Sequence, residues 1–255
     1  MKTIGLLSGK GGVGKTSTAV NLSAALNTFG KQTILVDANI TTPNVGLHLG
    51  VPTSPITLHH VLRGENKIEE AVYRHASGIS FIPGSLALED MNALKFSHLK
   101  SLKTLNTDFV ILDGAAGLGR EALAAMEHSD ELIIITNPEL PAMADALKTI
   151  RIAEDLGKEV RGVVITRAKQ DKLDISPRNI EAMLEKPVIG IIPEDSNMRL
   201  ALSMKNALVH THPQSNAARA YRQLAAALIG EALADDTVKL NWIDKFFKLF
   251  KRKAQ

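Results

Sequence analysis

The sequence predicts a single α/β domain with a mostly parallel central sheet and helices on both of its faces. Three observations predict it: six short apolar runs, helical stretches between these runs, and a glycine-rich loop directly after the first run. The runs are nearly continuous rather than alternating, as expected for strands that are buried on both faces. Strands that alternate with helices favour parallel pairing. The expected strands are residues 3–8, 33–38, 109–114, 131–136, 160–166 and 188–193.

The segment after the glycine-rich loop has a clear helical pattern. Ala19, Leu22, Leu26 and Phe29 recur at the spacing that places apolar side chains on one face of a helix. Gly30 is expected to end this helix, because glycine readily adopts the left-handed backbone conformation found at helix C-termini. The order strand, glycine-rich loop, helix is therefore predicted at the start of the chain.

The amino-acid composition excludes several classes of protein. The chain has 255 residues, 45% of them hydrophobic and 22% charged, which suits one large globular domain with a substantial core. No apolar run approaches the ~18 residues that a membrane-spanning helix needs, and the N-terminus lacks the pattern of a signal peptide. The absence of cysteine excludes a thiolate-held zinc or iron–sulfur site and is compatible with a cytoplasmic location.

The net charge of +3 is distributed unevenly along the chain. Residues 239–253 contain six basic side chains and one acidic side chain, so the remainder of the chain is net negative. A DNA-binding domain usually carries its positive footprint on the globular part, so DNA is not expected as a partner. We expect residues 1–234 to form the domain and residues 235–255 to form a C-terminal helix capped by Asp235 or Asp236.

The loop after the first expected strand, SGKGGVGKTS at residues 8–17, matches the phosphate-binding pattern G-x-x-x-x-G-K-[ST]. In such a loop the backbone N–H groups point into one concavity, and the following helix adds its positive end. Lys15 is expected to reach the β- and γ-phosphates of a nucleoside triphosphate, and the Thr16 hydroxyl is expected to ligate Mg²⁺.

The same loop also fits a dinucleotide-binding pattern, with Gly9, Gly11 and Gly14 as its glycines and Asp37 at the end of the next strand. Both motifs follow a strand and open a helix, so position alone does not separate them. The Lys-Thr pair after the last glycine does separate them, because a phosphate loop uses both residues and a dinucleotide site needs neither. The sequence therefore favours a nucleoside triphosphate.

Lys10 is a second lysine in a loop whose chemistry needs only one. The alternative, which the loop alone makes the less favoured one, is a solvated surface side chain. The whole loop, however, resembles the deviant Walker A motif of the MinD/ParA ATPases, in which this lysine reaches the ATP of a second subunit across a homodimer. The resemblance continues through residues 36–50, VDANITTPNVGLHLG, which are similar to switch I of that family, and through residues 109–119, FVILDGAAGLG, which are similar to switch II.

Further segments extend the resemblance over nearly the whole chain. Residues 136–139 (TNPE), 165–167 (ITR) and 192–195 (IPED) are similar to segments that follow the later strands of MinD proteins, with the archaeal type most similar. Within the wider family, the lack of cysteine argues against nitrogenase iron protein and the iron–sulfur carriers. The only tyrosines, Tyr73 and Tyr221, do not form the C-terminal cluster of bacterial tyrosine kinases.

The resemblance implies ATP as the substrate and Mg²⁺ as the cofactor. Lys15, with Lys10 of a second copy, would neutralise the γ-phosphate, while Thr16, Asp37 and Asp113 would hold the metal or its waters. Both aspartates end expected strands, where such sheets place ligands, although a strand-end aspartate is often only a helix cap. The implied nucleotide site, whose last four members are adenine contacts, comprises Gly9, Lys10, Gly11, Gly12, Val13, Gly14, Lys15, Thr16, Ser17, Thr166, Arg167, Pro193 and Glu194.

The chain departs from the family pattern in both switches. Switch I commonly reads Asp-x-Asp, and the position of the second carboxylate is Asn39 here. Asparagine can orient the attacking water but cannot accept its proton, so we expect slow ATP hydrolysis. Switch II has Gly114 and Ala115 where the family usually has another residue followed by proline. Asn44 and Gly117, by contrast, match switch residues of the family.

The last residues of the chain form an amphipathic pattern that resembles the membrane-targeting helix of MinD proteins. On a wheel of ~100° per residue, an aromatic and aliphatic face opposes a basic face. Such a helix can also dock in a protein groove, but rings paired with cations favour an anionic membrane surface. A single C-terminal helix of this kind binds a membrane weakly, so we expect an ATP-bound dimer to attach through its two C-terminal helices. The expected membrane-contacting residues are Leu240, Trp242, Ile243, Lys245, Phe246, Phe247, Lys248, Leu249, Phe250, Lys251 and Arg252.

Three functions fit these features. The first, which we favour, is a homodimeric ATPase in the cytoplasm that binds the inner face of the cell membrane and positions an unidentified protein partner, as in division-site selection. The second is a ParA-type partition ATPase that binds DNA, which the clustered phenylalanines and the acidic body argue against. The third is a scaffold that binds ATP to dimerise and barely hydrolyses it, which Asn39 suggests.

Overall fold

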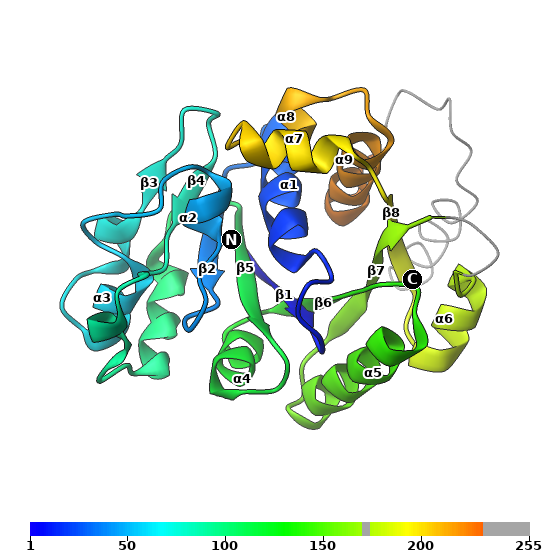
Figure 1. Ribbon diagram of the computed structural model, residues 1–255. Helices are drawn as coiled ribbons and strands as arrows, with labels where there is room; N and C mark the ends of the chain where they lie inside the picture. Colours follow the sequence, from blue (N-terminus) through cyan, green and yellow to red (C-terminus); the bar gives the residue numbers. More distant parts are fainter. Residues whose placement is uncertain (170–173, 232–255) are drawn as a thin grey trace.

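The computed structural model describes residues 1–169 and 174–231, which form one α/β domain around an eight-stranded sheet. The strand order is β3-β4-β2-β5-β1-β6-β7-β8 (Figure 1). Neighbouring strands are parallel except for β3 and β4, which pair antiparallel at one edge. The strands are β1 (Lys2–Ser8), β2 (Thr33–Ala38), β3 (Tyr73–Arg74), β4 (Ser80–Ile82), β5 (Phe109–Ala116), β6 (Glu131–Thr136), β7 (Val160–Ala168) and β8 (Val188–Pro193).

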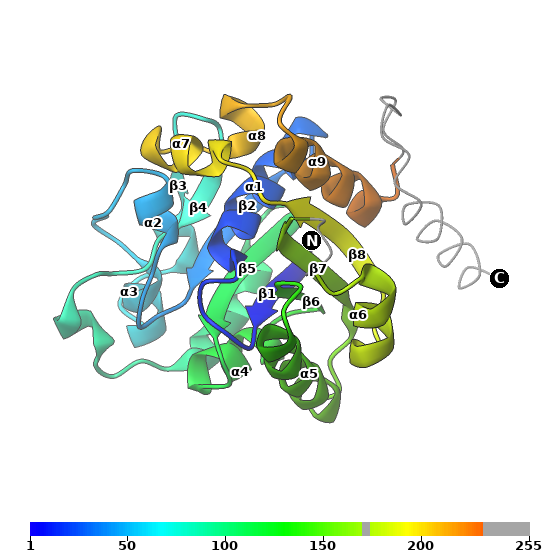
Figure 2. The same ribbon diagram turned by 45° about the vertical axis from the view of Figure 1, so that its right-hand side comes forward.

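Helices cover both faces of the sheet, as the two views in Figures 1 and 2 show. Helices α1, α7, α8 and α9 pack on one face, and α3, α4, α5 and α6 pack on the other. The α-helices are α1 (Lys15–Thr28), α2 (Val45–His48), α3 (Leu58–Arg63), α4 (Arg120–Glu127), α5 (Leu140–Asp155), α6 (Pro177–Leu184), α7 (Asn197–Ser203), α8 (Leu208–Thr211) and α9 (Asn216–Ile229). Short 3-10 helices are η1 (Ile68–Ala71), η2 (Leu88–Met91) and η3 (Phe96–Thr104).

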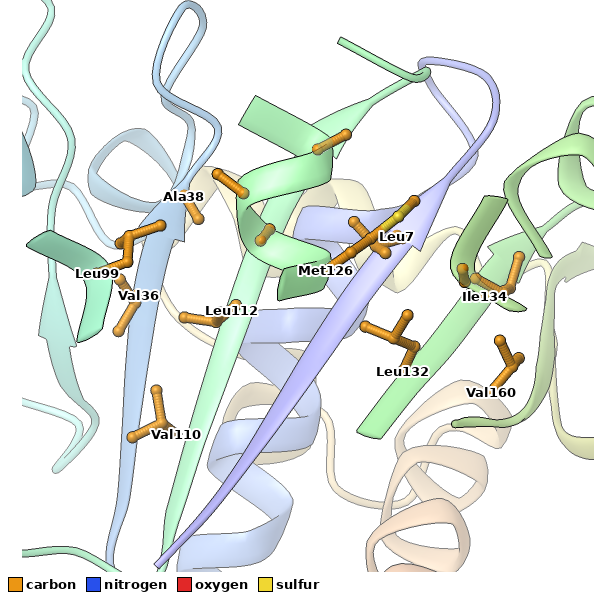
Figure 3. Close-up of a cluster of buried hydrophobic side chains, with 14 of the residues drawn as sticks. Leu7, Val36, Ala38, Leu99, Val110, Leu112, Met126, Leu132, Ile134 and Val160 are labelled. Atoms are coloured by element: carbon orange, nitrogen blue, oxygen red, sulfur yellow. The ribbon is translucent and has the colours of Figure 1, made fainter. Parts of the chain in front are cut away.

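The core lies in two layers, one on each side of the sheet. Successive side chains of a strand point to opposite faces, so Leu6 of β1 packs in the layer under α1 and Leu7 packs in the opposite layer. Figure 3 shows this second layer, where Val36 of β2 and Leu112 of β5 share one cluster with Met126 of α4. Burial on both faces is the physical reason for the nearly continuous apolar runs in the sequence.

The predicted fold class is confirmed. All six predicted strands are present, each within two residues of its expected ends, and the helix predicted after the glycine-rich loop is α1. Gly30, with φ 72°, follows its C-terminus as expected. The short strands β3 and β4 were not predicted, because runs of two and three residues are too short for a periodic pattern.

The strand order decides where a ligand can bind. The chain crosses from β1 through α1 to β2 on one side of β1, and from β5 through α4 to β6 on the other side. Ligands of such sheets bind outside the carboxyl ends of the strands, at the point where the order reverses. β2, β5 and β1 are neighbours in the sheet, so their carboxyl ends together border the candidate site.

The C-terminal predictions concern residues that the structure does not describe. The expected boundary near residue 234 and the amphipathic helix over residues 235–255 lie outside the described ranges. Within those ranges, no helix combines the length and the apolar character needed to cross a membrane.

Candidate functional site

The glycine-rich loop connects β1 to α1 and forms one wall of the candidate site. Gly14, with φ 86° and ψ 21°, directly precedes α1; this left-handed conformation carries little steric cost for glycine. No side chain caps this end of α1, so its first backbone N–H groups are available to an anion. Behind the loop, the Thr166 hydroxyl of β7 donates to the carbonyl oxygen of Val13 and holds the loop against the sheet.

Lys15 and Thr16, the first two residues of α1, share one acceptor. The Lys15 ammonium lies 2.8 Å from Oδ1 of Asp113, and the Thr16 hydroxyl donates to Oδ2 at 2.6 Å. The Lys15 residue is only 7% exposed and Asp113 is fully buried, so each charge depends on the other for compensation. β5 thereby fixes both side chains that a phosphate loop uses.

Asp37 lies opposite Asp113 in the register between β2 and β5. Its Oδ2 accepts the backbone N–H groups of Asn44 and Val45, both at 2.8 Å. Burial, together with the charge of Asp113, raises the pKa of Asp37 to about 8. Its other oxygen, Oδ1, is buried and has no hydrogen-bond partner within the described residues. Asp37 thus anchors the start of α2 and retains one carboxylate oxygen for a further donor or cation.

Two asparagine side chains hold the segment after β2 in a turn through hydrogen bonds to Thr42. The Asn39 amide nitrogen donates to the Thr42 carbonyl oxygen at 2.6 Å, and its amide oxygen lies 3.2 Å from the Thr42 hydroxyl. The Asn44 amide nitrogen donates to the same carbonyl oxygen at 2.7 Å. Both ends of the Asn39 amide are therefore engaged within this turn.

The same segment is linked to the first turn of α4. Oε2 of Glu121 accepts the backbone N–H of Thr41 at 3.2 Å, and Oε1 accepts the Thr41 hydroxyl. The guanidinium of Arg120 lies 6.0 Å from the centre of the Phe96 ring, a cation–π distance. Neither Arg120 nor Glu121 was predicted as a site residue. The signal that would have identified them is their position, a helix start at the carboxyl end of a central strand.

These groups surround a cleft of about 970 Å³, at the upper end of the ~300–1,000 Å³ usual for ligand sites. The predicted residues that line it are Gly11, Gly12, Val13, Gly14, Lys15, Thr16, Ser17, Asn39, Asn44 and Arg167. The predicted residues outside its lining are Gly9, Lys10, Asp37, Asp113, Gly117, Thr166, Pro193 and Glu194.

The residues outside the lining fall into separate groups. Asp37, Asp113 and Thr166 are buried directly behind residues that do line the cleft. Pro193 and Glu194 lie at the end of β8, the edge strand, where Glu194 is exposed. Of the four implied adenine contacts, Arg167 alone lines the cleft.

Two further predicted residues border the cleft without lining it. Gly117 donates its N–H to the carbonyl oxygen of Ser8 at 2.8 Å, which joins the loop after β5 to the phosphate loop. Lys10 is exposed near the start of that loop, two residues after Ser8. Within residues 1–169 and 174–231, no hydrogen bond or ion pair engages the Lys10 ammonium.

The departure from the family pattern at Gly114 has a packing reason. A Cβ atom at this position would lie 2.7 Å from Cδ2 of Leu7 and 3.1 Å from the carbonyl oxygen of Leu6. Because protein interiors are close-packed, a side chain there would force β1 and β5 apart. The next residue, Ala115, is half-buried and lines the cleft.

A buried histidine connects the segment after β2 to the segment after β4. His59 is fully buried; its Nδ1 accepts the backbone N–H of Ser85 at 3.0 Å, and its Nε2 lies 3.1 Å from the carbonyl oxygen of Ile40. Since Nδ1 accepts, the proton is on Nε2 and the neutral ring bridges both segments. Burial lowers the pKa of His59, which favours this neutral form. No sequence pattern distinguished this histidine from a surface one.

The oxygen donors around Thr16 suit a hard cation such as Mg²⁺. A hydroxyl and a carboxylate lie together there, and Asp37 keeps a buried oxygen without a partner nearby. Among the described residues, no group of three or more His, Cys, Asp or Glu side chains could hold a metal by itself. The cation would therefore share its coordination with water and phosphate oxygens, as Mg²⁺ usually does.

A phosphate loop at the switch point of a parallel sheet, with its lysine and threonine bound to a carboxylate of the adjacent strand, defines a P-loop nucleotide-binding protein. Comparison with known proteins narrows this class. The profile of the CobQ/CobB/MinD/ParA nucleotide binding domain matches residues 4–208. The chain belongs to this family, which confirms the predicted resemblance.

Three similar proteins illustrate the relationship. An uncharacterized ATP-binding protein from Methanocaldococcus jannaschii is 38% identical, over 98% of this chain and 97% of its own length. The septum site-determining protein MinD from Pyrococcus horikoshii, solved with Mg-ADP, is 32% identical with a TM-score of 0.85, over 94% of this chain and 99% of that chain. A chain of the MinC:MinD cell division complex from Aquifex aeolicus is 27% identical with a TM-score of 0.81, over 92% and 98% respectively.

Proposed function

We propose that this chain is a Mg²⁺-dependent ATPase of the MinD type that dimerises when ATP is bound, attaches to an anionic membrane surface and positions a partner protein. Nucleotide binding is supported above all by one observation: Lys15 and Thr16 both bind Asp113, beside the backbone N–H groups at the uncapped N-terminus of α1. The Mg-ADP bound to the relative from Pyrococcus horikoshii supports the same class of ligand here.

In this function, the phosphates of ATP take the place of Asp113 as the main partner of the Lys15 ammonium. Thr16 would bind Mg²⁺ directly, and Asp113 and Asp37 would hold its waters. When bound, the ion would supply positive charge against the β- and γ-phosphate oxygens. Because Asn39 is neutral and its amide is already engaged by Thr42, hydrolysis is slow.

Dimerisation follows from the chemistry of Lys10. Its ammonium is exposed at the rim of the phosphate loop and is not used within the described part of its own domain. The γ-phosphate of ATP in a facing copy is an anion that such a lysine can bind, so ATP draws two copies together. Without the γ-phosphate, the attraction across the interface is weaker and the dimer separates.

Membrane attachment is assigned to residues 237–255, on the pattern of their sequence alone. Each cation near an anionic surface adds about 1 kcal/mol, and a dimer that presents two tails gains avidity over a single tail. The attached protein then lies on the cytoplasmic face of the cell membrane. The occurrence of a relative in a MinC:MinD complex supports a protein as the downstream partner.

Co-sedimentation of the full chain with anionic vesicles, under ATP, ADP or no nucleotide, tests the proposal. We expect sedimentation with ATP and much less with ADP, and light scattering should show the dimer only with ATP. A chain without residues 237–255 should dimerise with ATP and stay in solution. Equal sedimentation in all three conditions would contradict the coupling of nucleotide to membrane.

Two other functions have distinct outcomes in related experiments. A ParA-type protein would bind duplex DNA with a strong salt dependence and would leave vesicles unbound. A non-hydrolysing scaffold would release no phosphate when vesicles are present, whereas its Asn39→Asp variant would. The exposed Lys10 and the basic tail fit all three functions, but the aromatic residues of the tail favour the membrane.

A further inference from the structure

Glu121 is the only acidic side chain that lines the cleft in the described part of the chain. It belongs to the first turn of α4 and is half-buried. The other side chains of the lining are cationic, neutral polar or apolar. Among these residues, Glu121 therefore supplies the carboxylate that water in the cleft can contact.

The two other carboxylates near the site are engaged behind the lining. Asp113 is fully buried, and its two oxygens bind Lys15 and Thr16. Asp37 is also fully buried, and it accepts two backbone N–H groups. Neither carboxylate faces the open cleft, so neither replaces the one that is absent at Asn39.

Glu121 lies beside that position. β2, which ends one residue before Asn39, pairs with β5, and α4 begins four residues after β5 ends. Thr41, two residues after Asn39, donates one hydrogen bond to each oxygen of the Glu121 carboxylate. These bonds orient the carboxylate and leave each oxygen a further lone pair for a water proton.

We propose that Glu121 orients and deprotonates the water that attacks ATP, in place of the switch I carboxylate that Asn39 lacks. The water oxygen forms a bond to the γ-phosphorus while the bond from that phosphorus to the bridging oxygen breaks, with its electron pair left on ADP. Glu121 accepts the water proton and then releases it to a phosphate oxygen or to solvent. The inference rests on the proposed ATPase function and assigns its catalytic carboxylate.

The decisive variant is Glu121→Gln in the full chain with Mg-ATP and anionic vesicles. Glutamine keeps an oxygen that accepts from Thr41 but cannot take a proton. Since a general base usually contributes about 10²–10⁴-fold, we expect kcat to fall at least about tenfold. Binding of a fluorescent, non-hydrolysable ATP analogue and the thermal midpoint of the nucleotide-free protein should change little. Glu127→Gln, at the exposed end of the same helix, is the matched control.

Rescue separates catalysis from a structural role. Asn39→Asp in the Glu121→Gln background should recover much of the rate, because it restores a carboxylate at the position of the family. The inference is overturned if Glu121→Gln retains the wild-type rate, if its analogue affinity and thermal midpoint fall in step with its rate, or if the wild type binds ATP without turnover. Failure of the wild type to bind ATP would instead contradict the proposed function itself.

Discussion

The ammonium of Lys15 lies 2.8 Å from Oδ1 of Asp113, and both side chains are buried. The lysine that phosphate binding requires is thus held by a carboxylate of its own domain. This ion pair must rearrange for the Lys15 ammonium to bind a triphosphate. Loss of the carboxylate should therefore lower the stability of the protein less when ATP is added than without it.

The variant Asp113→Asn tests this relationship. It leaves Lys15 as a buried cation without a counter-charge, which should lower the free energy of unfolding by up to about 3 kcal/mol. ATP in the presence of EDTA should recover part of this loss, because phosphate oxygens then serve as the partner. Urea unfolding with and without ATP measures both effects. Asp155→Asn, at the exposed end of α5, is the control, and an equal loss in both variants would contradict the assignment.

The role of Lys10 can be separated from that of Lys15. Lys10→Ala should retain most of the affinity for ATP, since Lys15 and the loop amides remain, but should weaken ATP-dependent dimerisation. Isothermal titration gives the affinity, and sedimentation velocity with ATP gives the oligomeric state. Lys103→Ala removes an exposed lysine elsewhere and should dimerise as the wild type does. A normal dimer in the Lys10 variant would show that this lysine has no role across an interface.

The apolar face of the tail is the third point to test. Phe247→Glu places a charge on the expected membrane-facing side and should abolish vesicle binding while ATP-dependent dimerisation persists. Asn241→Glu adds the same charge on the polar side and should cause a smaller loss. Flotation with anionic and neutral vesicles gives both values. If deletion of residues 237–255 leaves flotation unchanged, the anchor lies elsewhere.

His59 predicts an acid-dependent loss of stability. Its pKa in the folded protein is lowered from the ordinary 6.5 by burial, so the unfolded chain binds the proton first as the pH falls. Stability from the neutral ring is therefore complete above about pH 6.5 and decreases below it. Urea unfolding at about pH 7.5 and about pH 5.5 should show a smaller acid loss for His59→Gln than for the wild type.

His128→Gln provides the comparison for that experiment. His128 directly follows α4 and is half-buried, and its Nδ1 lies 2.9 Å from the carbonyl oxygen of Ala124 in that helix. Its substitution should leave the difference between the two pH values as large as in the wild type. If both histidine variants reduce the acid loss equally, the buried bridge between Ile40 and Ser85 is not its source.

The sequence predicted the phosphate loop well because all of its chemistry is local. Lys15 and Thr16 follow Gly14 directly, and α1 starts at Lys15, directly after the glycine-rich loop, as expected. Asp37 and Asp113 were predicted as a pair at strand ends, and the sheet register places them opposite each other. Of the implied adenine contacts, Arg167 lines the cleft, whereas Thr166, Pro193 and Glu194 lie outside its lining, and their contact with adenine stays a prediction.

The sequence by itself determined the fold class, the class of ligand and the position of the phosphate loop. Each of these depends on a pattern among residues close together in the chain: apolar runs for buried strands, helical periodicity, and a contiguous glycine-rich loop. Only the tertiary structure decided which side chains meet over the cleft. Thr41 and Glu121 are 80 residues apart, and His59 reaches Ile40 and Ser85 from a separate helix. Such contacts depend on the order in which strands assemble into the sheet, and no spacing within one segment of the sequence encodes that order.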